Sequence, residues 1–399
     1  MGRALSLIWR SLCVLLLVIA LAFALTGFSP IFNFAPARPF SGPDIFNPYE
    51  GLDSANCWKR ANFHTHTKVD GIFNECSHTP QETYDSLAAF GYDIVTFSNH
   101  NKLTVHPFDS SLQVNVYEHG YNLFKYHKLV FGAEKVLHYD NLLPILASQK
   151  QFQLDLLGRD SDFIQMNHPL RTGGTSESLF RKLSGYRIME LDSGVSTEQP
   201  YWDWALSAGR YSFGLANDDL HYPDRSERIA VRCNFLCTPS GRYDDLKRTL
   251  LSGGYYSMRV PDYGSGDWRL KHEGNRKLPA IRHIGLEGNT ICLELDRQAD
   301  SIRVTGQGGL TQMLVTNSCS LSYDFSPEDS YVRLTAFFPD GEVIYTNPFA
   351  RYDAASGQSP YQEFGHSVNL PLTILYNLAL LSLVLLIVYL IKITVRRKK

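Results

Sequence analysis

Two long segments without a charged residue, one near each end of the chain, limit how the rest of it can fold. The first runs from Ser11 to Phe28 and reads SLCVLLLVIALAFALTGF; the second runs from Leu370 to Ile391 and reads LPLTILYNLALLSLVLLIVYLI. Helices of these lengths cover the hydrocarbon layer of a bilayer, which is about 30 Å thick. We therefore expect one transmembrane helix over residues 11–28 and another over residues 370–391.

Basic residues predict the orientation of these helices, because Lys and Arg are enriched on the cytoplasmic side of a membrane. They lie on the terminal side of both segments, at Arg3, Arg10, Lys392 and in the run 396–399. We expect residues 1–10 and the tail 392–399 in the cytoplasm, and the chain between the helices on the extracytoplasmic side of the cell membrane. A cleavable signal peptide is the alternative for the first segment, since Ala35-Pro36-Ala37 is similar to a small-residue cleavage site. The second helix anchors the protein in either case.

The composition of the whole chain is that of a folded protein with no electrostatic preference for nucleic acid. Of the 399 residues, 44% are hydrophobic, and 38 Lys and Arg stand against 40 Asp and Glu, which gives a net charge of −2. Proteins that bind nucleic acid neutralise phosphates with clustered basic residues. We expect no nucleic-acid partner, and the sequence does not identify a protein partner.

Six cysteines lie outside the first apolar segment, in a region expected to face an oxidising compartment. They are Cys57, Cys76, Cys233, Cys237, Cys292 and Cys319. An even number in such a compartment permits disulfides. Cys57 with Cys76, and Cys292 with Cys319, are the candidate pairs, and spacing alone leaves the connectivity open.

The pattern of apolar runs divides the chain between the two helices. Residues 29–57 are rich in Pro, Phe, Asn and Gly and predict a linker. From residue 58 to about 267, short strand-like runs alternate with helix-like stretches, which is typical of an α/β domain. Residues 268–352 contain alternating runs such as ICLELD and YVRLTAFF, separated by turn residues, and predict a small all-β domain. Residues 353–369 form a second predicted linker.

Strand-like runs of the α/β domain end in residues that can bind metals. These are His64 and His66 in FHTH, Asp70, His100 in FSNH, Glu134 with the nearby His138, His168 in NHP, and Asp219 with His221 in NDDLH. Barrels and open α/β sheets place their chemistry at the carboxyl ends of strands, so one edge can collect all of them. Mixed imidazole and carboxylate ligands suit zinc, manganese or iron. The pattern predicts a site for divalent metal ions.

The order of these motifs, from H-x-H through Asp-Gly, His-Asn, Gly-x-Glu and Asn-His-Pro to Asp-x-His, resembles the polymerase and histidinol phosphatase (PHP) superfamily between about Trp58 and Tyr222. With LLSGGYYSMRV and YVRLTAFFPDGEVIYTNPF, the chain is most similar to the CehA/McbA group, which carries a C-terminal β domain. The resemblance implies a distorted seven-stranded (β/α) barrel with two or three divalent metal ions. It implies as ligands His64, His66, Asp70, His100, Glu134, His168, Asp219 and His221, with His138 matching approximately. The chain departs from the family at Asn99, where Asp is usual, and between His66 and Asp70, where one residue is missing.

Clustered divalent ions lower the pKa of bound water to about 7 and clamp attacking and leaving oxygens, which favours hydrolysis. We expect Glu134 to bridge the ions, because a carboxylate can span two cations. Arg171 comes three residues after His168 and can fork onto phosphoryl oxygens. With Glu134, Arg171 and His221 as catalytic residues, the sequence predicts a membrane-tethered phosphoesterase that uses a metal-bridged hydroxide on a small phosphorylated molecule. Amide or carbamate hydrolysis, and a non-catalytic metal-stabilised binding module, remain as alternatives.

Overall fold

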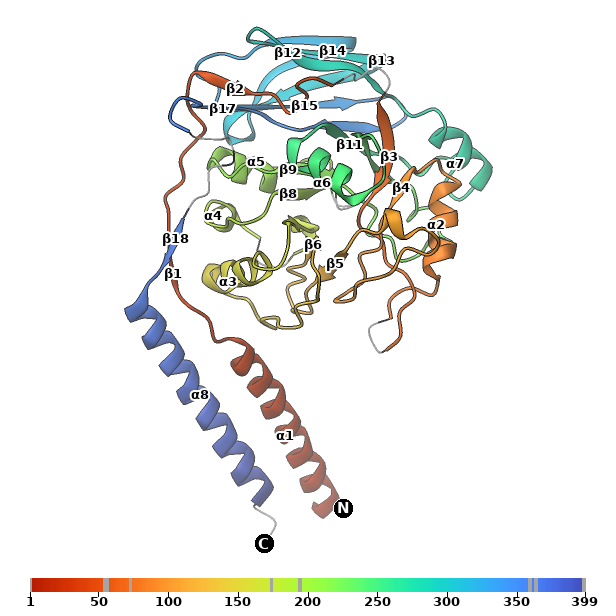
Figure 1. Ribbon diagram of the computed structural model, residues 1–399. Coiled ribbons are helices and arrows are strands. Elements are labelled where there is room, and N and C mark those ends of the chain that lie inside the picture. The colour runs from red at the N-terminus through yellow and green to blue at the C-terminus, as the bar shows by residue number, and fades with distance from the viewer. Residues whose placement is uncertain are drawn as a thin grey trace.

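The computed structural model describes residues 2–52, 57–71, 74–172, 175–192, 196–357, 361 and 365–396, so the end of the predicted basic tail, residues 397–399, lies outside the described part. Two long helices project from one side of a globular part (Figure 1). Helix α1 covers Gly2–Thr26 and helix α8 covers Leu370–Arg396. Both are long and apolar enough to cross a membrane, and only 6% of the apolar window of each is buried in the protein.

The segments that join these helices to the globular part lie side by side and form a neck. Strand β1 (Phe32–Phe34) pairs antiparallel with strand β18 (His366–Val368). Asn377 of α8 accepts a hydrogen bond from the Ser29 N–H at 3.3 Å and donates one to the Ser29 carbonyl at 3.0 Å. Both predicted linkers therefore contain strand, and the neck holds the two helices together.

A five-stranded sheet forms the middle of the globular part. Its strands, in spatial order, are β5 (Val116–His119), β6 (Lys128–Phe131), β7 (Phe163–Met166), β8 (Ile188–Leu191) and β9 (Phe213–Ala216). The β5–β6 and β6–β7 pairs are antiparallel, whereas β7–β8 and β8–β9 are parallel. All five strands are fully buried, and each lies in one contiguous apolar core.

An eleven-stranded sheet packs on the five-stranded sheet and continues to the top of the molecule in Figure 1. Its strands are β2 (Asp44–Phe46), β3 (Trp58–Asn62), β4 (Ile94–Val95), β10 (Arg232–Cys237), β11 (Tyr255–Arg259), β12 (Ile281–Glu287), β13 (Thr290–Thr305), β14 (Thr311–Asp324), β15 (Tyr331–Phe337), β16 (Val343–Thr346) and β17 (Phe349–Tyr352). Strand β11 pairs with β16 across the predicted domain boundary at residues 267 and 268. The division into domains stays a prediction, and one sheet runs through both predicted parts.

The helices of the globular part are short. They are α2 (Pro80–Ala88), α3 (Ala147–Leu157), α4 (Glu177–Phe180), α5 (Pro200–Ser207), α6 (Tyr243–Ser252) and α7 (Trp268–Asn275), with 3-10 turns η1 (Ser110–Leu112), η2 (Pro169–Arg171) and η3 (Gln307–Gly309). Thr79 caps α2 in a capping box with Glu82, and Gly253 ends α6 in the left-handed conformation. The fold is therefore of the mixed α/β class.

The described strands do not close into the expected seven-stranded barrel. Strands β3 and β4 belong to the large sheet, and they meet the five-stranded sheet only through two isolated parallel bridges. One bridge joins Thr65 to Leu220 and the other joins His100 to Glu118. The globular part consists of two open sheets, which pack against each other through β9, β10 and β11 and are joined by these two bridges.

Side chains make the hydrogen bonds that a continuous ladder would otherwise supply between the two sheets. The amide of Asn234 on β10 accepts from the Ala216 N–H at 2.9 Å and donates to the Ala216 carbonyl at 2.9 Å. The Phe63 N–H donates to Oδ1 of Asn217 at 3.0 Å. Because buried backbone groups need partners, these polar side chains let the sheets stay separate without leaving those groups unpaired.

A buried ion pair ties the five-stranded core to the outer part of the large sheet. Arg333 on β15 donates from Nε to Oδ1 of Asp203 on α5 at 2.8 Å, and from Nη2 to Oδ2 at 2.6 Å. Tyr331 donates to the same carboxylate at 3.0 Å. A bidentate pair with an added hydroxyl donor satisfies the carboxylate away from water, so it fixes the position of α5 against β15.

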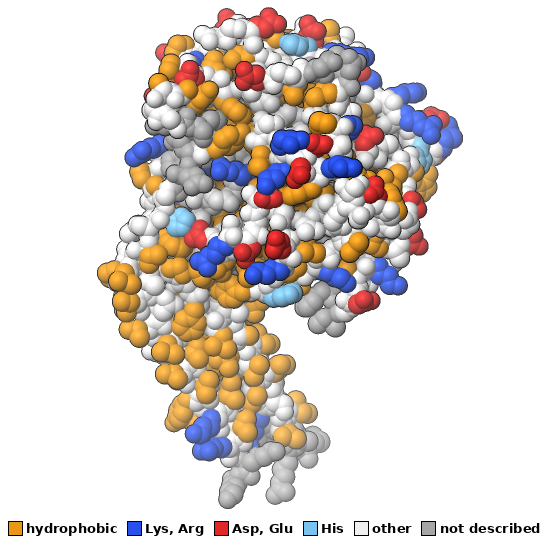
Figure 2. Space-filling model, in the orientation of Figure 1, with side chains coloured by type: hydrophobic (Ala, Val, Ile, Leu, Met, Phe, Trp, Pro, Cys, Tyr) orange, Lys and Arg blue, Asp and Glu red, His pale blue; other side chains and the backbone are white. Residues whose placement is uncertain are grey.

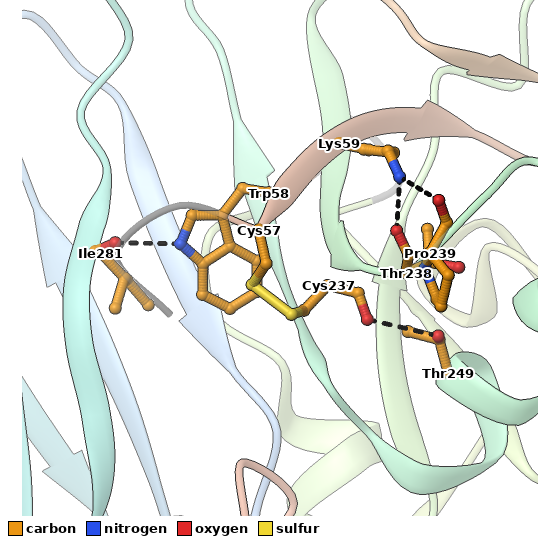
Figure 3. The surroundings of a disulfide bond; sticks show 8 residues. All are labelled: Cys57, Trp58, Lys59, Cys237, Thr238, Pro239, Thr249 and Ile281. Atoms are coloured by element: carbon orange, nitrogen blue, oxygen red, sulfur yellow. Dashed lines mark hydrogen bonds between the residues drawn. A yellow bond between two sulfur atoms is a disulfide. The ribbon is translucent and has the colours of Figure 1, made fainter. Parts of the chain in front are cut away.

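One disulfide joins neighbouring antiparallel strands of the large sheet. Cys57 precedes β3 and bonds to Cys237 at the end of β10 (Figure 3). The neighbouring Trp58 donates to the Ile281 carbonyl at 3.0 Å, which links β3 to β12. The candidate pairs Cys57–Cys76 and Cys292–Cys319 are wrong, because Cys76, Cys292 and Cys319 are free thiols. Strand order places Cys237, which is distant in sequence, next to Cys57.

Replacing Cys57 by Ser should lower the free energy of unfolding of the oxidised protein by about 2–4 kcal/mol, because the disulfide restrains a loop in the unfolded chain. The bonded cysteines are 180 residues apart in the sequence. Urea denaturation measures the change, and Cys319→Ser, at an exposed free thiol, should leave the midpoint unaltered. Peptide mapping that found Cys57 linked to Cys76 would contradict the assignment.

Candidate metal centre

Three strands bring four side chains of the metal-ligand type to one edge of the two sheets. His64 and His66 follow β3, Glu118 lies on β5 and Asp219 follows β9. The Nε2 atoms of both histidines lie 3.2 Å from Oε2 of Glu118, and they lie 3.2 and 3.3 Å from Oδ1 of Asp219. Two imidazoles and two carboxylates at these distances could hold one divalent ion.

Glu118 also faces three further imidazoles. Its Oε1 lies 3.2 Å from Nδ1 of His127 and 3.2 Å from Nε2 of His168, and its Oε2 lies 3.2 Å from Nε2 of His100. The carboxylate is 1% exposed. Imidazole nitrogens therefore surround both oxygens of Glu118, which is the arrangement expected of a carboxylate that bridges two cations.

A third group lies toward solvent. His66, His100 and His221 place ring nitrogens close together, and the rings of His66 and His221 stack with centroids 4.0 Å apart. Glu75 reaches this group, with Oε2 3.2 Å from Nε2 of His100 and 3.1 Å from Nε2 of His221. The partly exposed side chains of this group form the side of the cluster that solvent can reach.

A second buried carboxylate contacts the ring of His64 and the backbone N–H of His168. Glu190 on β8 places Oε1 2.8 Å from Nδ1 of His64, and its Oε2 accepts a hydrogen bond from the His168 N–H at 2.7 Å. A hydrogen bond at one ring nitrogen fixes the tautomer and leaves the other nitrogen to bind a metal. Glu190 therefore directs Nε2 of His64 toward Glu118.

The unsatisfied atoms of the cluster fit a metal ion. The Nε2 atoms of His64 and His66 are buried and, although carboxylate oxygens lie 3.2–3.3 Å away, make no contact of hydrogen-bond geometry within the described residues. Burial alone would raise the pKa of Glu118, but nearby His100 and His64 lower it well below its usual range. The cluster thus presents an ionised carboxylate among imidazole nitrogens that need a partner.

Six of the predicted ligands meet in this cluster. They are His64, His66, His100, His168, Asp219 and His221. Asp70, Glu134 and His138 are exposed and belong to none of the three groups. Glu75, rather than Asp70, approaches His100 and His221. Asp70 lies on an exposed part of the loop, outside the three groups.

The direction of β6 explains why Glu134 is absent from the cluster. Strand β6 is antiparallel to both β5 and β7, so its amino end meets the carboxyl ends of those strands. His127 directly precedes β6 and enters the cluster, whereas Glu134 follows β6 at the opposite edge. There its neighbour Lys135 lies 3.8 Å from Asp160, shortly before β7 begins. Glu118, and not Glu134, is the carboxylate that the imidazoles surround.

Four cluster residues lie outside the sequence prediction: Glu75, Glu118, His127 and Glu190. A signal for two of them exists in the sequence, because Glu118 in VYEH and Glu190 in IMEL are single carboxylates inside apolar strands. A buried charge needs a partner, so a Glu in such a strand indicates a cation or an imidazole nearby. Without the antiparallel direction of β6, His127 resembles an ordinary loop histidine.

Arg171 lies beside the cluster and is hydrogen-bonded to one of its carboxylates. It ends η2, is 38% exposed, and donates from Nη2 to Oδ2 of Asp219. Burial alone would lower the pKa of Arg171, but Asp219 and Glu190 raise it. Because a guanidinium has five N–H donors, Arg171 can orient Asp219 and still offer donors to an anion.

Two other polar residues next to the ligands have structural contacts. Asn99 accepts from the Thr67 N–H and donates to Oγ1 of Thr104, both at 2.7 Å, so it joins the loops after β3 and β4. Asp218 accepts from the backbone N–H groups of Ala230 and Arg232 at 2.9 and 2.8 Å. Asp219, and not Asp218, therefore faces the cluster.

Comparison with known proteins gives little beyond this geometry. No family model and no curated protein matches the sequence. One solved structure that aligns with the chain is described as a two-domain protein containing a predicted PHP-like metal-dependent phosphoesterase, from Bacteroides vulgatus. It is 13% identical, with a TM-score of 0.37, and the alignment covers 79% of this chain and 100% of that one. A likeness at this level supports no inference about function.

Glu118→Gln should lower the affinity for a divalent ion by more than about 100-fold, since even the loss of an outer partner of a metal ligand costs about 10–100-fold. Glu134→Gln provides the matched control, because that carboxylate is exposed and outside the cluster. Elemental analysis after titration with a chelator measures both variants. Equal metal retention by Glu118→Gln and the unaltered protein would remove Glu118 from the site.

Proposed function

We propose that this chain is a divalent-metal-dependent hydrolase of phosphoesters, tethered to a membrane by α1 and α8 with its globular part outside the cytoplasm. One observation carries the proposal: both oxygens of the buried Glu118 lie 3.2 Å from imidazole nitrogens, on strands and loops from both sheets. Such a carboxylate is suited to bridge cations. The exposed apolar surface of both long helices supports the tether.

Clustered divalent ions, when bound, supply Lewis acidity and make water nucleophilic at neutral pH. His64, His66, Glu118 and Asp219 would hold one ion, and Glu118 would share a second with His100, His127 and His168. Glu190 fixes His64 from behind. Zinc, manganese and iron all suit these ligands.

One cation beside the cluster favours a phosphoester over a neutral substrate. Arg171 lies at the exposed side of the cluster, next to Asp219, where it can bind phosphoryl oxygens with donors that Asp219 does not use. A neutral amide or carbamate needs no such cation. His221 and Glu75 are also partly exposed and in contact with each other at 3.1 Å, so they line the side from which substrate arrives.

Arg171→Lys should lower kcat/KM for a phosphoester by about 10–100-fold, because it keeps the charge but loses the forked donors. A panel of phosphomonoester, phosphodiester and carbamate substrates measures the specificity, with metal content recorded for each protein. Arg159→Lys, an exposed position before β7 at the opposite edge, should leave turnover unaltered. Turnover of carbamates alone, or bound metal without any turnover, would contradict the proposal.

A further inference from the structure

The loop between β5 and β6, which carries the cluster residue His127, is linked through residue 142 to the end of α1. In Figure 1 the chain after β3 continues to the lower border of the globular part, on the side from which α1 and α8 leave. The loops after β4 and β5 reach the same border. Figure 2 shows hydrophobic side chains over the pair of helices, and hydrophobic, basic and acidic side chains together at the base of the globular part. These loops therefore lie at the end of the globular part from which the helices leave.

Hydrogen bonds at the end of α1 connect that helix to the loop between β5 and β6. The N–H of Leu142 donates to Oγ1 of Thr26, the last residue of α1, at 3.3 Å, and Tyr139 donates to the Thr26 carbonyl at 3.1 Å. The Leu123 N–H in turn donates to the Leu142 carbonyl at 3.0 Å. Only two hydrogen bonds thus separate Leu123 from the end of α1.

The same loop enters the metal cluster four residues later. His127 contacts Glu118, and the loop before it is braced by Asn122, which accepts from the Tyr126 N–H at 2.8 Å and donates to Oδ2 of Asp140 at 3.1 Å. A braced loop holds its tip at a fixed distance from its base. Leu123 and His127 therefore connect the helix end to the cluster through one rigid loop.

Exposed apolar side chains lie on the loop after β4, on the loop after β5 and on the segment before α3. We call them the apolar rim: Val105, Phe108, Leu123 and Ile145. Val105 is 75% exposed, Leu123 64% and Ile145 65%. Val105 follows Thr104, which accepts a hydrogen bond from Asn99 next to the cluster residue His100. Apolar residues this exposed are costly in water but favourable in the interface of a bilayer.

Exposed lysines accompany the rim. Lys68, Lys102 and Lys125 lie on the loops after β3, β4 and β5, and all three are exposed. Lysines next to apolar side chains are the pattern of segments that contact anionic head groups. The rim thus matches a lipid surface in both its apolar and its basic residues.

We propose that the apolar rim lies in the head-group layer and that the substrate is a phosphoester carried by a lipid of the same leaflet. The proposal rests on the proposed function and adds the source of the substrate. A head-group phosphate already lies at the depth of the loops that hold His100 and His127, so it reaches the cluster by lateral movement along the leaflet. A phosphoester dissolved in water has the same phosphoryl chemistry but gains nothing from the rim.

The test uses the full-length metal-loaded protein in vesicles that contain a phosphorylated lipid, with a water-soluble aryl phosphate as the second substrate. Leu123→Asp and Val105→Asp should lower the ratio of lipid turnover to soluble turnover by about tenfold each, because a charge replaces an apolar contact with the bilayer. Leu314→Asp is the matched control, since Leu314 is 56% exposed on β14, far from the helices. It should leave the ratio unaltered.

A second measurement does not depend on activity. A photoreactive lipid in the same vesicles should cross-link to peptides that contain Val105, Leu123 and Ile145, and not to β14. Cross-links confined to α1 and α8, with none on the peptides of the rim, would overturn the proposal. Soluble turnover without lipid turnover would overturn it while leaving the hydrolase intact, whereas rim cross-links without turnover of either substrate would reject the hydrolase alone.

Discussion

The arrangement of the whole cluster depends on one buried carboxylate, Glu118. Five imidazoles approach its two oxygens, from His64, His66, His100, His127 and His168. An ionised carboxylate at 1% exposure is unfavourable unless positive charge or donors surround it. The loops after β3 and β4, the start of β6 and the end of β7 all converge to meet this need. The two open sheets are joined at Glu118 itself, through its bridge to His100.

Sequence patterns predicted the edge of the sheets correctly but not every residue at it. His64, His66, His100, His168, Asp219 and His221 each follow a strand that points the expected way, and they meet as the rule about strand ends requires. The rule fails at β6, because an apolar run such as LVF carries no mark of its direction in the sheet. One reversed strand exchanges Glu134 for His127.

Other differences between prediction and structure have the same origin in pairing between distant strands. The apolar alternation after residue 268 correctly indicated strands, but local pattern does not say that β16 pairs with β11 and extends the sheet of the metal cluster. The cysteines show the same limit, since Cys237 becomes the partner of Cys57 only because β10 lies beside β3. The buried pair of Asp203 and Arg333 then holds the extended sheet against α5.

The neck also determines the order in which the chain can assemble. Ser29 and Asn377 are bonded although they are 348 residues apart in the sequence, so β1 leaves the ribosome long before β18 exists. The globular part can fold in that interval and bring the two ends close, which removes most of the entropy cost of closing so long a loop. Neck closure therefore cannot occur before β18 has been synthesised. A chain that stops before residue 366 lacks both the partner strand of β1 and the helix that packs on α1. Only a chain that extends through α8 can therefore form the neck.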